Sequence, residues 1–212
     1  MGENRIKLVA ADMDGTLLNR ERKITKYTQN VIKKAMAQGV YFVPATGRAV
    51  NALPPELKEM EGIRYGIFSN GATIYDLKEE KVIYKNHFEM DRVLELMKFL
   101  KQFDLMESIS LNGQSYANKK EMENIDYYEL DSNTKAIVQG SRVLVDDLEM
   151  FVKEQSTTVE KTTLLFKTME ERRRVADALS KIEDIQFSSS LPKNLEISKK
   201  GCNMTDVFLK WN

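Results

Sequence analysis

The chain is poor in the residues that build disulfides, histidine metal centres and membrane spans. Its 212 residues include one cysteine, Cys202, and one histidine, His87. One cysteine excludes an internal disulfide and fits a reducing compartment, so we predict a cytoplasmic location. One histidine excludes metal sites built from a histidine pair and argues against a Ser/His/Asp hydrolase. No apolar run approaches the roughly 20 residues of a membrane-spanning helix, and we therefore expect no membrane partner.

The chain also lacks an excess of charge of either sign. It has 32 Lys and Arg residues and 32 Asp and Glu residues, which gives a formal net charge of zero. Nothing global therefore recruits nucleic acid, and we expect none as a partner. The hydrophobic fraction of 42% is ordinary for a folded protein. The length suffices for one large domain or for a core with an inserted module.

Short apolar runs alternate with amphipathic stretches in the first part of the chain. This order of strands and helices is typical of a parallel sheet with crossover helices. A hairpin is expected directly after the third strand. We predict strands over 6–11, 40–45 and 65–69, helices over 25–38 and 50–60, and a hairpin from 73–75 and 81–84.

The pattern changes after Tyr84, where helices begin to interleave with alternating strands. We predict helices over 90–103, 143–154 and 169–181, and strands over 106–111, 115–118, 162–167 and 185–189. We leave the polar section 119–140 without an assignment. The predicted organisation is an α/β core over 1–84, an α+β module over 85–190, and a return to the core over 191–212.

Two acidic side chains, Asp12 and Asp14, follow the first predicted strand. Strand periodicity sends them toward the same side, at the carboxyl end where open α/β sheets place ligands. Such a pair can divide labour, one carboxylate attacking and its neighbour moving a proton. Gly15 lets the backbone turn sharply after them. The alternative is a polar loop after a buried strand.

Polar residues also follow the second and third predicted strands. The hydroxyl of Thr46 and the N–H of Gly47 are suited to phosphoryl oxygens, and Arg48 is suited to a phosphate or a carboxylate. Asn70, in Ser69-Asn70-Gly71-Ala72, could orient a nucleophile or a substrate through its amide. The alternatives are a strand-to-helix turn capped by Thr46 and an Asn-Gly hairpin turn at Asn70.

The sequence Asp12-Met-Asp14-Gly-Thr-Leu-Leu18 resembles the first motif of the haloacid-dehalogenase-like (HAD) phosphohydrolases, and the later pattern resembles their Cof-type, cap-bearing branch (subclass IIB). The resemblance implies a Rossmann-like core with an inserted α+β cap of the C2 type. It implies that Asp12 is the phosphoryl-accepting nucleophile and Asp14 the acid and base. Mg²⁺ would be held by the Asp12 carboxylate and the Asp14 backbone carbonyl. Ala45-Thr-Gly-Arg48 resembles the second motif, which implies that Thr46 binds phosphoryl.

The later motifs of the family are matched in part. Asn194-Leu-Glu-Ile197, followed by Lys200-Gly201, resembles the approach to the third motif, but Met204 stands where its catalytic lysine is expected. Lys199 or Lys200 could replace that lysine after a small backbone shift. The fourth motif, Gly-Asp-x-x-Asn-Asp, does not occur before Asn212. We therefore expect an incomplete core, a truncated family member, poor Mg²⁺ affinity and impaired activity.

An incomplete core would leave the strand over 6–11 at the edge of its sheet. An exposed apolar edge invites pairing with another chain. We expect a homo-oligomer formed through this edge, or a chain of low stability.

We thus predict a phosphohydrolase that uses Mg²⁺ to cleave small phosphorylated metabolites such as sugar phosphates through an aspartyl phosphate, with impaired activity. A catalytically inactive binding or structural module is the second hypothesis, favoured by Met204. A glycosyltransferase metal site at Asp12-x-Asp14 is a third, against which the Gly-Thr-Leu-Leu continuation argues.

Overall fold

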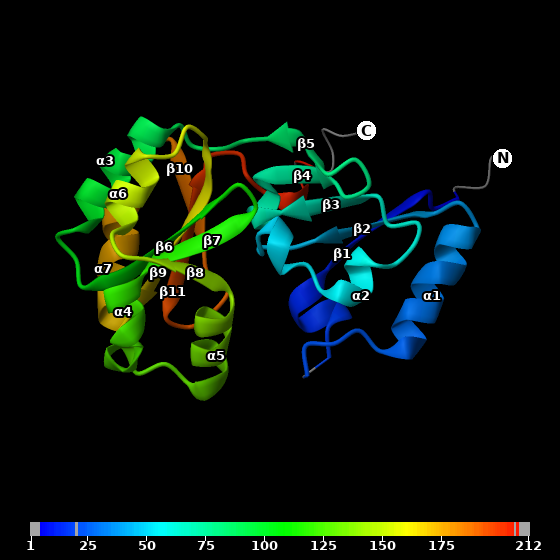
Figure 1. Cartoon of the computed structure of the whole chain (residues 1–212), viewed down its shortest axis with the longest axis horizontal. Helices are drawn as coiled ribbons and strands as arrows, with labels where there is room; N and C mark the ends of the chain where they lie inside the picture. The colour runs from blue at the N-terminus through cyan, green and yellow to red at the C-terminus, as the bar shows by residue number, and fades with distance from the viewer. Residues whose placement is uncertain (1–4, 20, 206, 208–212) are drawn as a thin grey trace. The chain divides into compact units, whose positions relative to one another are not determined.

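The computed structural model describes residues 5–19, 21–205 and 207. The chain divides into two compact units, each built on its own sheet (Figure 1). The first unit comprises the described residues up to Lys85 and those from Asn203 onward, and the second runs from Asn86 to Cys202. The predicted α/β class, with a parallel-strand core interrupted by an α+β unit, is confirmed. Among the described residues no helix is long and apolar enough to cross a membrane.

The first unit is built on a sheet whose first three strands run parallel. Within its described residues, five strands pair in the order β1-β2-β3-β4-β5. The β3–β4 and β4–β5 pairs are antiparallel, as in the predicted hairpin. Because β1, β2 and β3 are parallel, their carboxyl ends lie at one edge of the sheet. The strands are β1 (Leu8–Asp12), β2 (Tyr41–Ala45), β3 (Tyr65–Phe68), β4 (Thr73–Asp76) and β5 (Lys81–Lys85).

The helices of the first unit begin in different ways. Thr25 caps α1 (Lys26–Ala37), because its Oγ1 accepts the N–H of Thr28 at 3.1 Å. The single helix predicted over 50–60 is wrong. The structure has a short 3₁₀ turn, η2 (Val50–Ala52), and one helical turn, α2 (Pro55–Lys58). Two consecutive prolines at 54 and 55 restrict where the helix begins, since each ring disfavours helical backbone in the residue before it.

Within the described part of its sheet, strand β1 lies at the edge. The N–H of Tyr41 donates to the Lys7 carbonyl at 2.8 Å, so strand alternation turns the backbone of Leu8 and Ala10 away from β2. Among the described residues β2 is the only strand paired with β1. The expected edge position is therefore confirmed, but the expected burial is wrong, because Val9 and Ala10 are exposed.

We predict that a second copy of the chain pairs with this edge. A lysine in the middle of β1 should oppose such pairing, because its charged side chain would then lie within the sheet that the two copies form together. The change Ala10→Lys should therefore convert a dimer into a monomer in sedimentation velocity runs. Val31→Lys, on the exposed surface of α1, is the matched control and should leave the dimer intact. A wild-type chain that sediments as a monomer over the whole concentration range contradicts the prediction.

The second unit has a mixed sheet, with six strands in the order β10-β11-β9-β6-β7-β8 among its described residues. Only the β7–β8 pair in this described sheet is parallel. The strands are β6 (Leu105–Leu111), β7 (Gln114–Asn118), β8 (Arg142–Val145), β9 (Val159–Phe166), β10 (Ile185–Ser188) and β11 (Asn194–Lys199).

Helices pack on both faces of this second sheet. One face lies against three helices through a large apolar cluster that includes Phe88, Leu96 and Phe166. Part of the opposite face lies against two shorter helices through Met106, Met122 and Val138 (Figure 1). The first set is α3 (Met90–Leu100), α6 (Leu148–Lys153) and α7 (Met169–Leu179); the second is α4 (Lys119–Glu123) and α5 (Ser132–Gly140), with the 3₁₀ turn η4 (Ile125–Tyr128) between them.

Two sequence predictions for this unit need correction. The helix predicted over 143–154 begins only at Leu148, where Asp147 caps it, because the preceding Val-Leu-Val run extends the sheet as β8 beside β7. The return to the core predicted at 191 also differs. β11 lies between β10 and β9, with Leu195 and Ile197 buried, so the second unit continues to Cys202.

Glu107 of the second unit has a carboxyl oxygen that is buried without a hydrogen-bond partner. Oε1 of Glu107, on β6, is inaccessible and makes no hydrogen bond. Burial, followed by the charges of Glu121 and Glu149, raises the pKa of Glu107 to about 8, and Lys101 opposes the shift. Glu107 is therefore protonated in the folded chain at neutral pH and ionised in the unfolded chain.

This carboxyl makes stability fall as the pH rises. The folded state retains the proton up to about pH 8, whereas an unfolded glutamate loses it near 4.5. The free energy of unfolding should decline between these values, by about 1.4 kcal/mol for each unit of pKa difference. We predict that Glu107→Gln removes this decline in urea titrations and stabilises the protein at pH 8. The control variant Glu123→Gln, at an exposed position, should retain the decline in stability with pH. Equal dependence of the free energy of unfolding on pH in the two variants would refute the assignment to Glu107.

Candidate active site

The first two predicted site residues lie where β1 ends. Asp12 is its last residue and Asp14 follows in extended backbone (φ −78°, ψ 116°). Both carboxylates are exposed, whereas Met13 between them is fully buried. At Gly15 the backbone enters the left-handed region (φ 81°), which glycine adopts without strain. The chain therefore turns away directly after presenting two carboxylates at the sheet edge.

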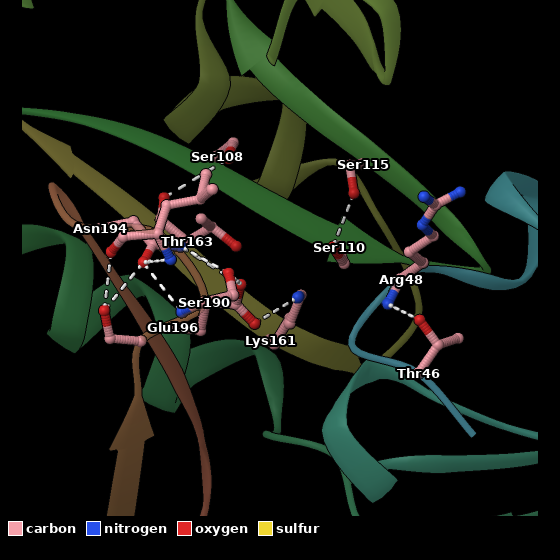
Figure 2. A network of polar contacts seen from close by, with 12 residues as sticks. Thr46, Arg48, Ser108, Ser110, Ser115, Lys161, Thr163, Ser190, Asn194 and Glu196 are labelled. Carbon is pink, nitrogen blue, oxygen red and sulfur yellow. Dashed lines mark hydrogen bonds and ion pairs between the residues drawn. The ribbon is translucent and has the colours of Figure 1, made fainter. Parts of the chain in front are cut away.

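The loop after β2 lies beside this acid pair. Asp12 lies opposite Ala45, the last residue of β2, so Thr46 is the first residue after the neighbouring strand. The Thr46 side chain is buried, and its Oγ1 accepts the N–H of Arg48 at 3.2 Å (Figure 2). This hydrogen bond tightens the Thr46-Gly47-Arg48 turn, which directs the Arg48 side chain toward the acids.

Arg48 binds Asp14 through both carboxylate oxygens. Its Nε donates to Oδ2 at 2.9 Å and its Nη2 to Oδ1 at 2.6 Å. A third N–H, on Nη1, donates to the Ala52 carbonyl at 3.3 Å. The arginine side chain is 18% exposed and that of Asp14 is 55% exposed. This two-point contact fixes the orientation of the Asp14 carboxylate, while Asp12 carries the second negative charge of the site.

The turn after β3 holds the Thr46–Arg48 loop in place. The N–H of Ser69 donates to the Arg48 carbonyl at 2.9 Å, and the N–H of Asn70 donates to the Thr46 carbonyl at 3.2 Å. Phe68 pairs with Thr73, so the segment is also the hairpin turn between β3 and β4. It forms the 3₁₀ turn η3 (Ser69–Gly71). The backbone of Asn70 thus contributes to the site by positioning the phosphate-binding candidates.

Gly71 permits a close approach of two segments of the first unit. Its φ is 92°, and an added Cβ would lie 2.7 Å from the backbone carbon of Asn203. Glycine is needed there for both the conformation and the space. Asn203 is therefore seated against the turn that holds Thr46 and Arg48.

The two candidates near the third motif belong to different units. Lys200 belongs to the second unit, where its N–H donates to the Asp184 carbonyl at 2.9 Å and its carbonyl accepts Nδ2 of Asn86 at 3.0 Å. Its assignment to phosphate binding stays a prediction. Met204 is partly buried against an apolar cluster that contains Val43 and Ile67. The position expected to hold a lysine therefore serves packing.

The oxygen donors of the acid pair fit Mg²⁺ only in part. Mg²⁺ takes six oxygen ligands, several of which are usually water and substrate phosphate. The Asp12 carboxylate and the Asp14 carbonyl are suitable donors, but Arg48 occupies both carboxylate oxygens of Asp14. No group of three His, Cys, Asp or Glu side chains able to hold a metal ion occurs among the residues that the structure describes.

Sequence reasoning named the members of this site but missed how they connect. Asp14 and Arg48 are 34 residues apart, and no pattern links them before the strands are placed in parallel. The Ser69 N–H and the Asn203 backbone were not identified as parts of the site. The glycine at 71 was the available signal for a close backbone approach.

Comparison with known proteins identifies the family of this chain. The family model described as haloacid dehalogenase-like hydrolase matches residues 9–205, so the chain belongs to that family. A haloacid dehalogenase-like hydrolase structure from Bacillus subtilis superposes with a TM-score of 0.81 at 20% identity, over 97% of this chain and 78% of that one. The subclass IIB sugar phosphatase BT4131 superposes with a TM-score of 0.71 at 20% identity, over 97% and 76%. These likenesses confirm the fold, an α/β core interrupted by an α+β unit.

Curated relatives extend well beyond the aligned region. A protein of Buchnera aphidicola (subsp. Schizaphis graminum) named as a phosphatase is 39% identical over 121 residues, 56% of this chain and 43% of the relative. The 5-amino-6-(5-phospho-D-ribitylamino)uracil phosphatase YcsE of Bacillus subtilis is 25% identical over 209 residues, 97% of this chain and 70% of the relative. The match thus spans less than half the length of the Buchnera relative.

Proposed function

We propose that the chain is a phosphohydrolase of small phosphorylated metabolites such as sugar phosphates. One observation carries the proposal: the exposed Asp12 carboxylate stands in register with Ala45, beside a loop whose Arg48 holds Asp14 at two points. This arrangement offers a nucleophile, an oriented acid and base, and a polar loop for phosphate. The names of the family members BT4131 and YcsE support the substrate class.

Asp12 attacks the phosphorus atom of the ester. A carboxylate oxygen forms the new O–P bond, the P–O bond to the alcohol breaks, and the alcohol leaves with a proton from Asp14. Water then attacks the aspartyl phosphate while Asp14 takes a proton from it. Inorganic phosphate and the free Asp12 carboxylate result.

Arg48 positions Asp14 for these proton transfers. The contact of 2.6 Å to Nη2 fixes the orientation of the carboxylate that takes a proton from water in the second step. In the first step Asp14 must carry a proton, and Arg48 must then release it. An incoming phosphate dianion is the group that draws the guanidinium away, because it presents the same two-point acceptor.

The loops after β2 and β3 bind the phosphoryl oxygens. Thr46 and Gly47 face the transferring group without adding negative charge, and Asn70 orients their loop through its backbone. We propose that Lys200 supplies positive charge to the phosphate. Mg²⁺, when bound through the Asp12 carboxylate and the Asp14 carbonyl, would neutralise phosphoryl charge.

Turnover is slow in this proposal, because Met204 cannot neutralise the charge of an aspartyl phosphate. Its side chain packs against apolar neighbours of the first unit. The same observation favours a second candidate function, a module that binds phosphorylated ligands without cleaving them. A reducing cytoplasm is the compartment we propose, because Cys202 is the one cysteine of the chain and is buried without a disulfide.

Hydrolysis of p-nitrophenyl phosphate tests the proposal. With Mg²⁺ present, the wild-type chain should release phosphate slowly, and Asp12→Asn should lower the rate by at least about 10³-fold because the nucleophile is lost. Asp91→Asn, an acid at the start of α3, is the control and should retain full activity. Phosphate binding without any release by the wild-type chain would establish the binding module instead.

Substitution of Arg48 tests how Asp14 is positioned. Without the guanidinium fork, Asp14 loses its fixed orientation, so Arg48→Gln should slow alkyl phosphates by about 10²-fold. p-Nitrophenyl phosphate should suffer less, because its leaving group needs no proton. Arg64→Gln, which removes another ion-paired arginine of the first unit, is the control. An equal loss for both ester classes would assign Arg48 to phosphate binding alone.

A further inference from the structure

The turn between β3 and β4 has an unusual backbone. Three consecutive residues have positive φ, namely Ser69 (52°), Asn70 (61°) and Gly71 (92°). Among the residues that the structure describes, no other run of positive φ is longer than two residues. This left-handed region is disfavoured for a residue with a Cβ, because the Cβ crowds the backbone carbonyl oxygen. The turn therefore holds backbone strain at two residues that are not glycine.

A hairpin does not require this strain. The second unit contains a simpler example, in which Asn112 (φ 49°) and Gly113 (φ 74°) link β6 to β7. Two residues of positive φ are the usual signature of such a two-residue loop. Phe68 pairs with Thr73, so β3 and β4 are linked by four residues, and loops of that length are most often built around a type I turn of negative φ. Closing the hairpin is therefore not the reason for the left-handed run.

The left-handed run directs two successive N–H groups to the same side of the chain. In an extended strand successive N–H groups point to opposite sides, whereas in a helical turn they point the same way. The N–H of Ser69 donates to the Arg48 carbonyl at 2.9 Å. The N–H of Asn70 donates to the Thr46 carbonyl at 3.2 Å. The turn after β3 thus holds the short loop after β2 at two points.

Close packing holds the strained turn in place. Phe68, Ser69 and Ala72 are fully buried. A Cβ added at Gly71 would lie 2.7 Å from the backbone carbon of Asn203. Strained backbone of this kind persists only where the surrounding structure leaves the chain no alternative, and it is concentrated at functional sites.

We propose that Asn70 is a positioning residue of the phosphate site and acts through its left-handed backbone instead of its side-chain amide. The inference rests on the proposed function, in which Thr46 and Gly47 bind phosphoryl oxygens. Asparagine is one of the few residues with a Cβ that adopt this conformation routinely. While Asn70 holds it, its N–H and that of Ser69 keep the loop in the form that receives phosphate. When the turn relaxes, the carbonyls of Thr46 and Arg48 lose these donors, and phosphate affinity falls.

Two substitutions of Asn70 separate the backbone from the side chain. Glycine lacks the amide but adopts the left-handed conformation without strain, whereas alanine lacks the amide and disfavours the conformation. Asn70→Gly should therefore bind inorganic phosphate as the wild-type chain does. Asn70→Ala should bind it about five- to tenfold more weakly, the equivalent of the strain that alanine adds. The measurement is a titration of the full chain with inorganic phosphate, followed by NMR.

The same spectra contain a signal that a purely structural change would not move. Nε of Arg48 donates to Oδ2 of Asp14, so its ¹H–¹⁵N signal reports whether the loop keeps its place. Asn70→Gly should leave this signal at its wild-type position. Asn70→Ala should shift it toward the position of a free guanidinium group.

Asn112→Ala is the matched control. Asn112 is also a left-handed asparagine followed by glycine in a hairpin, but it belongs to the second unit and is exposed. Its replacement adds the same backbone strain and should lower the melting temperature to a similar extent. Phosphate affinity and the Arg48 signal should not change.

Three outcomes would overturn the positioning role. An equal loss of phosphate affinity in Asn70→Gly and Asn70→Ala would assign the role to the amide. Wild-type affinity in both variants would show that the conformation does not control binding. If Asn70→Ala does not fold, hydrogen exchange in the wild-type chain decides. Saturating phosphate should slow exchange of the Ser69 and Asn70 amide protons, because binding and the turn stabilise one another; unchanged exchange is the third contrary outcome.

These results can be told apart from a failure of the proposed function. Phosphate binding that follows the conformation of Asn70, in a chain that hydrolyses no ester, would retain the positioning role and reject the phosphatase activity. Ester hydrolysis with phosphate affinity unaffected by Asn70→Ala would do the reverse.

Discussion

The parallel pairing of β1 with β2 and of β2 with β3 brings the candidate active site together. Residues near positions 12, 46 and 70 are far apart in the sequence, and no local interaction draws them close. Parallel strands all end at one edge, and the register of Asp12 with Ala45 places the two neighbouring loops at the same height. The contact between Asp14 and Arg48, and the backbone bonds from Ser69 and Asn70, all depend on that register. The site is therefore a property of the sheet more than of any single loop.

The sequence allowed much of this arrangement to be predicted, because local signals were strong where strands end. The apolar run before Asp12 and the motif from Asp12 to Leu18 located β1 and its turn, and the periodicity over 25–38 located α1. The helix over 50–60 and the one over 143–154 were misjudged. Two prolines overrode periodicity in the first case, and pairing with β7 drew residues 142–145 into a strand in the second. Pairing partners distant in sequence carry no periodic signal.

The two units differ in what their polar groups do. In the first unit, Arg48 and Asp14 are joined at the surface, where a charged ligand can exchange with either. In the second, Lys161 and Glu196 are buried and matched to one another. Met204 lies among apolar side chains of the first unit, so its position contributes cohesion and no charge.

The close approach of Asn203 and Gly71 restricts both residues. Asn203 is the first residue after the chain leaves the second unit, and an added Cβ at Gly71 would lie 2.7 Å from its backbone carbon. The neighbouring Ser69 and Asn70 are hydrogen-bonded to the carbonyls of Arg48 and Thr46. A side chain at position 71 would therefore have to displace either Asn203 or the turn whose backbone holds the Thr46–Arg48 loop.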